Sequence, residues 1–205
     1  MNSFERCSQL AARSLADLHP FLEETQGRYV LTDKGRLSRV FQETFGDLIF
    51  NSANGTMHTV ELKAEEKWTG NLFLEIWSNF NFTNHESYTA LGPTPGWLLK
   101  LNADLLFYHF LSHDKLVICS LPALQRWAFI NKSRNYSEPD ARGERHQLAG
   151  RVFDFRQRKQ ERHQQKNVTV GGLVPVKTLE AELSPPPKVC AVRQLKLSLF
   201  GDEAA

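Results

Sequence analysis

The sequence predicts an α/β fold of the α+β kind, in which a central mixed β-sheet is flanked by helices. Two observations carry this prediction. Apolar residues recur at helical spacing in residues 3–18 and 33–45, whereas from residue 47 to residue 78 they follow strand patterns. Helical patterns return after Pro122 and Pro175. A chain of 205 residues with 41% hydrophobic residues suits one such domain with extensions.

Two helices are expected before the first strand. In residues 3–18 the apolar side chains fall on one face, and Pro20 marks the end of the helix or a kink in it. In residues 33–45 the same spacing recurs, and Gly46 ends the helix. The sheet is expected to begin directly after this glycine.

The remaining elements are expected in the following order. Strands are predicted over residues 47–50, 58–65, 71–78, 97–110, 115–119 and 168–176, and helices after Pro122 and Pro175. The chain accordingly divides into an N-terminal helical segment (1–30), a main domain (31–183), and a Pro-rich linker with a C-terminal tail (184–205).

The first two predicted strands bring together acids and a lysine. In a hairpin symmetric about Asn54, opposite residue numbers sum to about 108, which places Asp47 across from Glu61. Glu61 and Lys63 are two residues apart on one strand and share its face. Facing carboxylates repel each other, and Mg²⁺, or Mn²⁺ in its place, would relieve the repulsion. Lys63 would then orient a water molecule or stabilise charge on a phosphate. The alternative is an exposed strand face with ordinary cross-strand charge pairs.

The order helix, acid, hairpin and Glu-x-Lys resembles the PD-(D/E)XK phosphodiesterase superfamily, whose core contains a helix, a mixed sheet and an acid followed by (Asp/Glu)-x-Lys on the next strand. The matching runs are Gly46-Asp47-Leu48-Ile49, Val60-Glu61-Leu62-Lys63, Gly96-Trp97, Ala103-Asp104 and Val174-Pro175. The resemblance implies a restriction-endonuclease-like core over residues 30–183. It implies that Asp47 and Glu61 hold the metal and that Lys63 serves the attacking water. Glu43 is the match to a further acid of the preceding helix.

Two other acids and one basic segment have a structural and a functional interpretation. Glu75 either joins the acidic cluster or has an ordinary structural role, on a solvated face or paired to Lys67, and the structural role is favoured. Asp104 is expected to cap a strand end, with a functional role as the alternative. Residues 142–166 contain eight Lys or Arg against three acids, which suits a phosphate backbone or a solvated basic helix face equally well.

The C-terminal tail resembles the short peptide with which bacterial and phage replication proteins bind the sliding clamp. The residues that match are Gln194, Leu195, Leu197, Leu199 and Phe200. In this interpretation the apolar side chains fill pockets of the clamp and Gln194 supplies hydrogen bonds. The alternative is an edge strand of the domain, which has the same alternation.

Composition limits the class of protein. No apolar run is long enough to span a membrane, and the three widely spaced cysteines favour reduced thiols and a cytoplasmic location. We therefore expect a Mg²⁺-dependent DNA nuclease tethered to the sliding clamp. The alternative is a catalytically inactive nuclease-like protein that binds the clamp and modulates replication.

Overall fold

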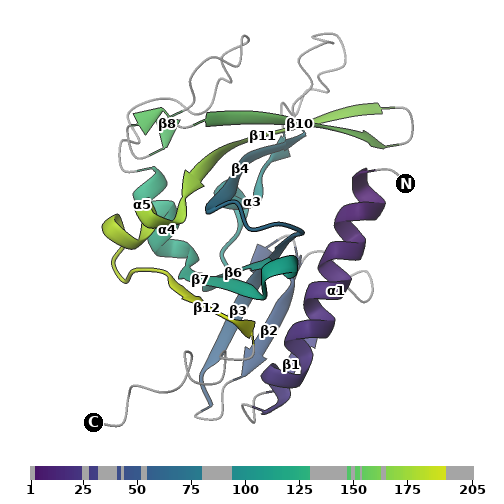
Figure 1. Ribbon diagram of the computed structural model, residues 1–205, viewed down its shortest axis with the longest axis vertical. Helices are drawn as coiled ribbons and strands as arrows, with labels where there is room; N and C mark the ends of the chain where they lie inside the picture. The colour runs from purple at the N-terminus through teal and green to yellow at the C-terminus, as the bar shows by residue number, and fades with distance from the viewer. Residues whose placement is uncertain are drawn as a thin grey trace.

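The computed structural model describes ten parts of the chain. They are residues 3–24, 28–31, 41–42, 44–51, 55–79, 94–129, 147–148, 151–152, 154–162 and 165–192. They form two principal sheets with helices packed around them (Figure 1). The prediction of an α+β fold with a mixed central sheet is confirmed.

The larger sheet has six strands. In spatial order they are β1 (Arg28–Leu31), β2 (Leu48–Asn51), β3 (Met57–Glu65), β6 (Leu105–Phe110), β7 (Lys115–Ser120) and β12 (Lys188–Cys190). Neighbouring strands are antiparallel except β3 and β6, which are parallel. The sheet is therefore mixed, and its parallel pair lies at its centre.

A second sheet lies beside the first (Figure 1). Its strands, in spatial order, are β10 (Asp154–Arg162), β11 (Gln165–Pro175), β4 (Asn71–Asn79) and β5 (Thr94–Pro95). A small separate ladder pairs β8 (Gln147–Leu148) with β9 (Arg151–Val152). The strand predicted over 71–78 is confirmed as β4, but it belongs to this second sheet. Residues 154–162 of the basic segment form a strand, so a basic helix face is wrong for this part of the segment.

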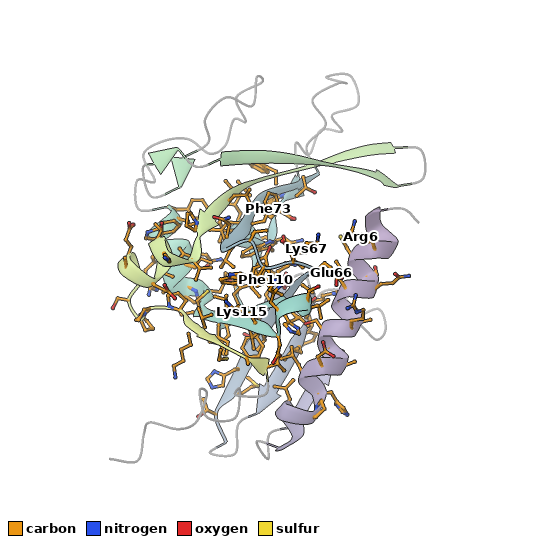
Figure 2. The ribbon with its side chains drawn as sticks, in the orientation of Figure 1. Arg6, Glu66, Lys67, Phe73, Phe110 and Lys115 are labelled. Atoms are coloured by element: carbon orange, nitrogen blue, oxygen red, sulfur yellow. The ribbon has the colours of Figure 1, made fainter. Side chains whose placement is uncertain are left out.

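Helices cover the larger sheet on both faces. They are α1 (Ser3–Glu24), α3 (Trp97–Lys100), α4 (Leu121–Ala128) and α5 (Val176–Glu182), with a short 3₁₀ turn, η2 (Leu111–His113). Leu18 and Leu22 of α1 pack on Val60 and Leu62 of β3 in one apolar core. Residues of β4, β6, β7, α3, α4 and α5 form a second, larger core on the opposite face. Phe110 of β6 is buried in that core (Figure 2), and its ring forms a T-shaped pair with the ring of Trp68.

Two predicted elements differ from the structure. The helix of residues 3–18 continues through Pro20 to Glu24, so the proline does not end it. The strand predicted over 97–110 begins only at Leu105. Trp97–Lys100 forms one helical turn instead, because an apolar run suits a buried helix as well as a buried strand.

The Pro-rich segment does not end the folded region. Pro187 is buried, and β12 pairs with β7 at the edge of the larger sheet. Val192 is also buried, and its N–H donates to Asp114 Oδ1 at 3.0 Å. Among the described residues, the sheet therefore extends beyond the predicted boundary at residue 183. No helix in the described parts is long and apolar enough to cross a membrane.

Candidate functional site

The β2–β3 hairpin has the predicted register. Leu48 pairs with Val60 and Ile49 with Thr59, so opposite residue numbers sum to 108. The Asp47 N–H donates to the Val60 carbonyl at 2.8 Å, which continues the ladder by one step. Asp47 is therefore brought to the level of Glu61, as predicted.

Gly46 makes this placement of Asp47 feasible. Its N–H closes the preceding helical turn onto the Gln42 carbonyl, and its φ of +96° turns the chain into the strand. A Cβ atom at this position would lie 2.6 Å from the Val60 carbonyl oxygen. Only glycine combines this backbone angle with such a close approach.

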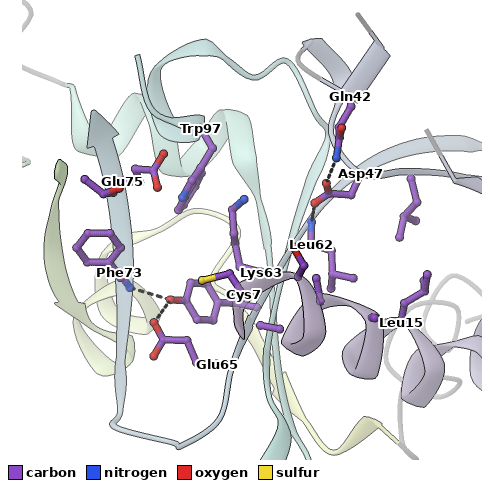
Figure 3. A pocket seen from close by; sticks show the side chains of 17 residues that line it. Cys7, Leu15, Gln42, Asp47, Leu62, Lys63, Glu65, Phe73, Glu75 and Trp97 are labelled. Atoms are coloured by element: carbon purple, nitrogen blue, oxygen red, sulfur yellow. Dashed lines mark hydrogen bonds between the residues drawn. The ribbon is translucent and has the colours of Figure 1, made fainter. Parts of the chain in front are cut away.

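The Asp47 carboxylate is held by two donors. The Leu62 N–H donates to Oδ2 at 2.8 Å, and the Gln42 side-chain amide donates to Oδ1 at 3.1 Å (Figure 3). One donor comes from the facing strand and the other from the last turn of the preceding helix. These two hydrogen bonds fix the position of the Asp47 side chain.

Glu61 and Lys63 form a partly buried ion pair on one face of β3. Glu61 is 4% exposed. Burial raises the pKa of Glu61 to about 7, against the opposing attraction of Lys63 and with a further upward contribution from Asp47. Burial by itself would lower the pKa of Lys63, but the surrounding carboxylates outweigh it and raise that pKa above its usual value. Lys63 is therefore a permanent cation at neutral pH.

Glu75 of β4, in the second sheet, lines one cavity together with Glu61 and Lys63 (Figure 3). Its charge acts on both Glu61 and Lys63. Glu75 is half-buried and lies with the acidic cluster, which is the less favoured of its two interpretations. Leu72, Leu74 and Ile76 pack in the core, and their neighbours Phe73 and Trp77 are buried as well. A strand that is apolar on both faces has no fully solvated face for its single carboxylate, and that signal is present in the sequence.

These side chains surround a cavity of about 230 Å³, which also contacts Trp97 and Lys100 of α3. Lys63 Nζ lies 5.9 Å from the centre of the Trp97 ring. A second cavity of about 560 Å³ lies between the N-terminal half of α1 and the second sheet, and Asp47, Lys63 and Glu75 line both. The charged cluster therefore sits where a larger space meets a smaller one.

The donor set fits a hard divalent cation. Asp47, Glu61 and Glu75 supply carboxylate oxygens, and their mutual repulsion is what a cation would relieve. Within the described residues, no three His, Cys, Asp or Glu side chains converge closely enough to enclose a metal ion. Mg²⁺ is usually bound through only one or two carboxylates, with waters and substrate phosphates completing its shell. Asp47 and Glu61 match that smaller requirement.

The other candidate residues separate into two groups. Asp104 accepts both the N–H and the hydroxyl of Thr59, at 2.8 and 2.9 Å, so it ties β3 to the start of β6 as the predicted cap. Glu43 and residues 194–200 lie outside the described residues. Gln42 and Trp97 are not among the predicted site residues. Gln42 lies only five residues before Asp47, in the turn that ends at Gly46, and nothing in the residue pattern singles it out, whereas Trp97 reaches the cavity through contacts between distant parts of the chain.

Comparisons of this chain with protein-family models, with curated proteins and with solved structures found no match.

Proposed function

We propose that the protein is a metal-dependent phosphodiesterase of the PD-(D/E)XK type that cuts nucleic acid, DNA in the first instance, at the Asp47–Glu61–Lys63 cavity. The register of the β2–β3 hairpin is the observation that carries this proposal. It brings an acid at the start of one strand beside the Glu-x-Lys of the next. Glu75 adds a third carboxylate to the same cavity.

The order of elements supports the same proposal. A helix, α1, precedes three antiparallel strands, and the third of these pairs in parallel with β6. This arrangement is compatible with a restriction-endonuclease-like core, which is the finer fold that the proposal implies. Fold alone does not establish activity, so the proposal depends on the site.

Each residue has a distinct role in the proposed chemistry. Asp47 and Glu61 would hold Mg²⁺, which when bound would supply a Lewis acid for the phosphate and lower the pKa of water. Lys63 holds its proton, because the carboxylates around it raise its pKa. It therefore acts as a fixed positive charge at Nζ that orients the phosphate and stabilises the charge developing on it. Gln42 holds the Asp47 carboxylate in position.

A second candidate function is a catalytically inactive domain that binds the sliding clamp. The direct ion pair between Glu61 and Lys63 favours it, because that pair occupies a proposed metal ligand. The clamp-binding segment, residues 194–200, begins two residues after Val192, which is anchored to Asp114. We propose clamp binding for this segment with either function, since a tether raises the effective concentration of the domain at DNA.

A cleavage assay tests the enzymatic proposal. Purified full-length protein is incubated with single- and double-stranded DNA and RNA in Mg²⁺, Mn²⁺ or EDTA. We expect cleavage that needs a divalent cation and is lost in Lys63→Ala. Asp47→Asn should also lose cleavage, and Asp104→Asn is its matched control, because Asp104, like Asp47, accepts an N–H of β3 but lies away from the cavity. Cleavage that survives Lys63→Ala would overturn the proposal.

Co-elution with a bacterial sliding clamp tests the tether. We expect binding by the full chain and its loss on deletion of residues 194–200. Clamp binding without cleavage in the first assay would favour the inactive function. The absence of co-elution would remove the proposed tether and leave the cavity chemistry unaffected.

A further inference from the structure

The β10–β11 hairpin forms the outer part of the second sheet and extends across the N-terminal end of α1 (Figure 1). The contacts between α1 and β10 place this hairpin over the helix. Most residues of the basic segment (142–166) that the structure describes belong to β10. The register of the hairpin therefore determines which basic positions lie on which face of the sheet.

One face of the second sheet is identified by its buried or half-buried residues. Phe73, Glu75 and Thr169 line the 560 Å³ cavity. Gly171 pairs with Glu75 on one side and with Arg156 on the other. Directly paired residues of an antiparallel ladder lie on the same face. Position 156 of β10 is consequently on the cavity face, and Gly171 of β11 lies between it and Glu75 of β4.

The same rule assigns the other basic positions. Arg158 pairs with Thr169, and alternate residues share a face, so positions 156, 158 and 162 all belong to the cavity face. Lys159 and Lys166 belong to the opposite face, where Lys166 pairs with Glu161. Over the whole β10–β11 hairpin, the cavity face has three arginine positions against one acid, Asp154 at the start of β10, whereas the other face has two lysines against one acid.

The spacing joins these positions to the charged cluster. Two neighbouring strand separations put the Cα of Arg156 roughly 9–10 Å from that of Glu75. Arg156 and Arg158 are roughly 6.5–7 Å apart along β10. A row of guanidinium-bearing positions thus begins close to the carboxylates and leads away from them along one strand.

We infer that this face of the β10–β11 hairpin binds the phosphate backbone of a single nucleic-acid strand and guides it into the cavity beside α1. The inference rests on the proposed function and names its substrate class. Arginine recognises phosphate through paired N–H donors, which favours a polyanion over a neutral ligand. A space of about 560 Å³ has the size of a small-molecule pocket, which suits one or two unpaired nucleotides and is too small for a duplex to enter.

Two double variants with the same change in net charge test the inference. Arg156→Gln/Arg158→Gln removes two charges from the cavity face, and Lys159→Gln/Lys166→Gln removes two from the opposite face. Fluorescence anisotropy of a labelled single-stranded DNA oligonucleotide, in EDTA and over a range of salt concentrations, measures binding by each full-length protein. Thermal unfolding of each variant shows whether it remains folded, and the single variant Arg158→Gln replaces the double one if it does not.

We expect binding on the order of 10-fold weaker for the arginine variant, with a salt slope lower by roughly 1.4, which corresponds to two lost phosphate contacts on a single strand. The lysine variant should bind like the unaltered protein. Equal weakening in both variants, unchanged binding in the arginine variant, or tighter binding of a duplex than of a single strand would overturn the inference.

Asp47→Asn separates this result from the proposed catalysis. It removes a proposed metal ligand, so it should lower the rate of cleavage by on the order of 10²–10³-fold while binding of the strand in EDTA persists. Loss of binding in the arginine variant supports the inference even if no protein of the series cleaves DNA. Cleavage that does not depend on Arg156 and Arg158 would leave the proposed function standing and reject the proposed role of the β10–β11 hairpin in binding the strand.

Discussion

Asp47 and Glu75 line the same cavity, but different parts of the molecule hold them there. Asp47 is fixed within one hairpin, by a backbone N–H of the facing strand and by a glycine that permits the turn. Glu75 comes from a strand whose partner, β11, lies about 100 residues later in the chain. The first acid depends on local structure, whereas the second reaches the cavity only when the two sheets pack together. The site is consequently a product of both sheets.

The largest expected effect separates the two acids by their chemistry. Asp47→Asn should lower the rate of cleavage by on the order of 10²–10³-fold, because it removes a proposed metal ligand but keeps an acceptor for the Leu62 N–H. Glu75→Gln should lower the rate less, since it acts on the site through charge. Single-turnover rates of both variants in Mg²⁺ give the comparison. An equal loss in the two would show that both sheets contribute ligands.

A smaller effect concerns the protonation of Glu61. Its pKa in the folded protein, about 7, lies above the usual value of 4.5. The folded state therefore binds this proton more tightly, and the contribution of Glu61 to stability falls as the pH rises from about 4.5 to about 7. The fall amounts to on the order of 3 kcal/mol.

Titration of the Glu61 carboxyl carbon by NMR measures this pKa directly. We expect the midpoint to fall in Asp47→Asn and, by less, in Glu75→Gln, in the order of their electrostatic contributions. Mg²⁺ should lower it further, because the cation stabilises the ionised form. A midpoint near 4.5 in the unaltered protein would contradict the account of Glu61.

Gly46→Ala tests the local structure that places Asp47. The new Cβ would meet the Val60 carbonyl at 2.6 Å in a backbone conformation that disfavours alanine, and we expect a loss of roughly 1–3 kcal/mol of unfolding free energy. Gly55→Ala is the matched control, since Gly55 also has a positive φ but has no atom within 4 Å of an added Cβ. Chemical denaturation of both variants separates the steric clash with Val60 from the backbone strain that the two positions share. Equal losses of unfolding free energy would show that the clash with the Val60 carbonyl contributes nothing.

The smallest effect is expected at Asp104. Asp104→Ala removes the acceptor of two hydrogen bonds from Thr59, which should cost about 1 kcal/mol because the residue is exposed. Cleavage should not change. A loss of activity comparable to that of Asp47→Asn, measured under conditions in which the variant is fully folded, would give Asp104 a functional role.

The parts of the site that could be predicted are those formed by neighbouring segments. The Asn-Gly pair at residues 54–55 and the alternation of residues 58–65 predict the register that β2 and β3 have, and with it the positions of Asp47, Glu61 and Lys63. Glu75 lies on the predicted strand and faces the cavity, which is the less favoured of its two interpretations. The apolar residues on both faces of β4 indicate that it is not fully solvated, but the cavity that it lines forms only when the second sheet packs against the rest of the molecule.

The remaining differences have the same physical cause. Residues 97–110 are apolar enough for a helix or a strand, and contacts with distant segments decide between them. The Asn102 N–H bonds to the Thr44 carbonyl and the Asp104 N–H to the Thr59 carbonyl, so this segment follows the hairpin before β6 begins. β12 was interpreted as a tail because three residues after a Pro-rich run have too little pattern to predict a strand.

Binding of a divalent cation is the most direct test of the central claim that Asp47 and Glu61 hold a metal ion. Electron paramagnetic resonance of free Mn²⁺ measures this binding without any need for cleavage. We predict that the unaltered protein binds Mn²⁺ and that Asp47→Asn and Glu61→Gln each weaken binding at least about 10-fold, as loss of a carboxylate ligand requires. Glu66→Gln, on the exposed bend after β3, should bind like the unaltered protein. Equal Mn²⁺ binding in all four proteins, or none in the unaltered one, would contradict the account.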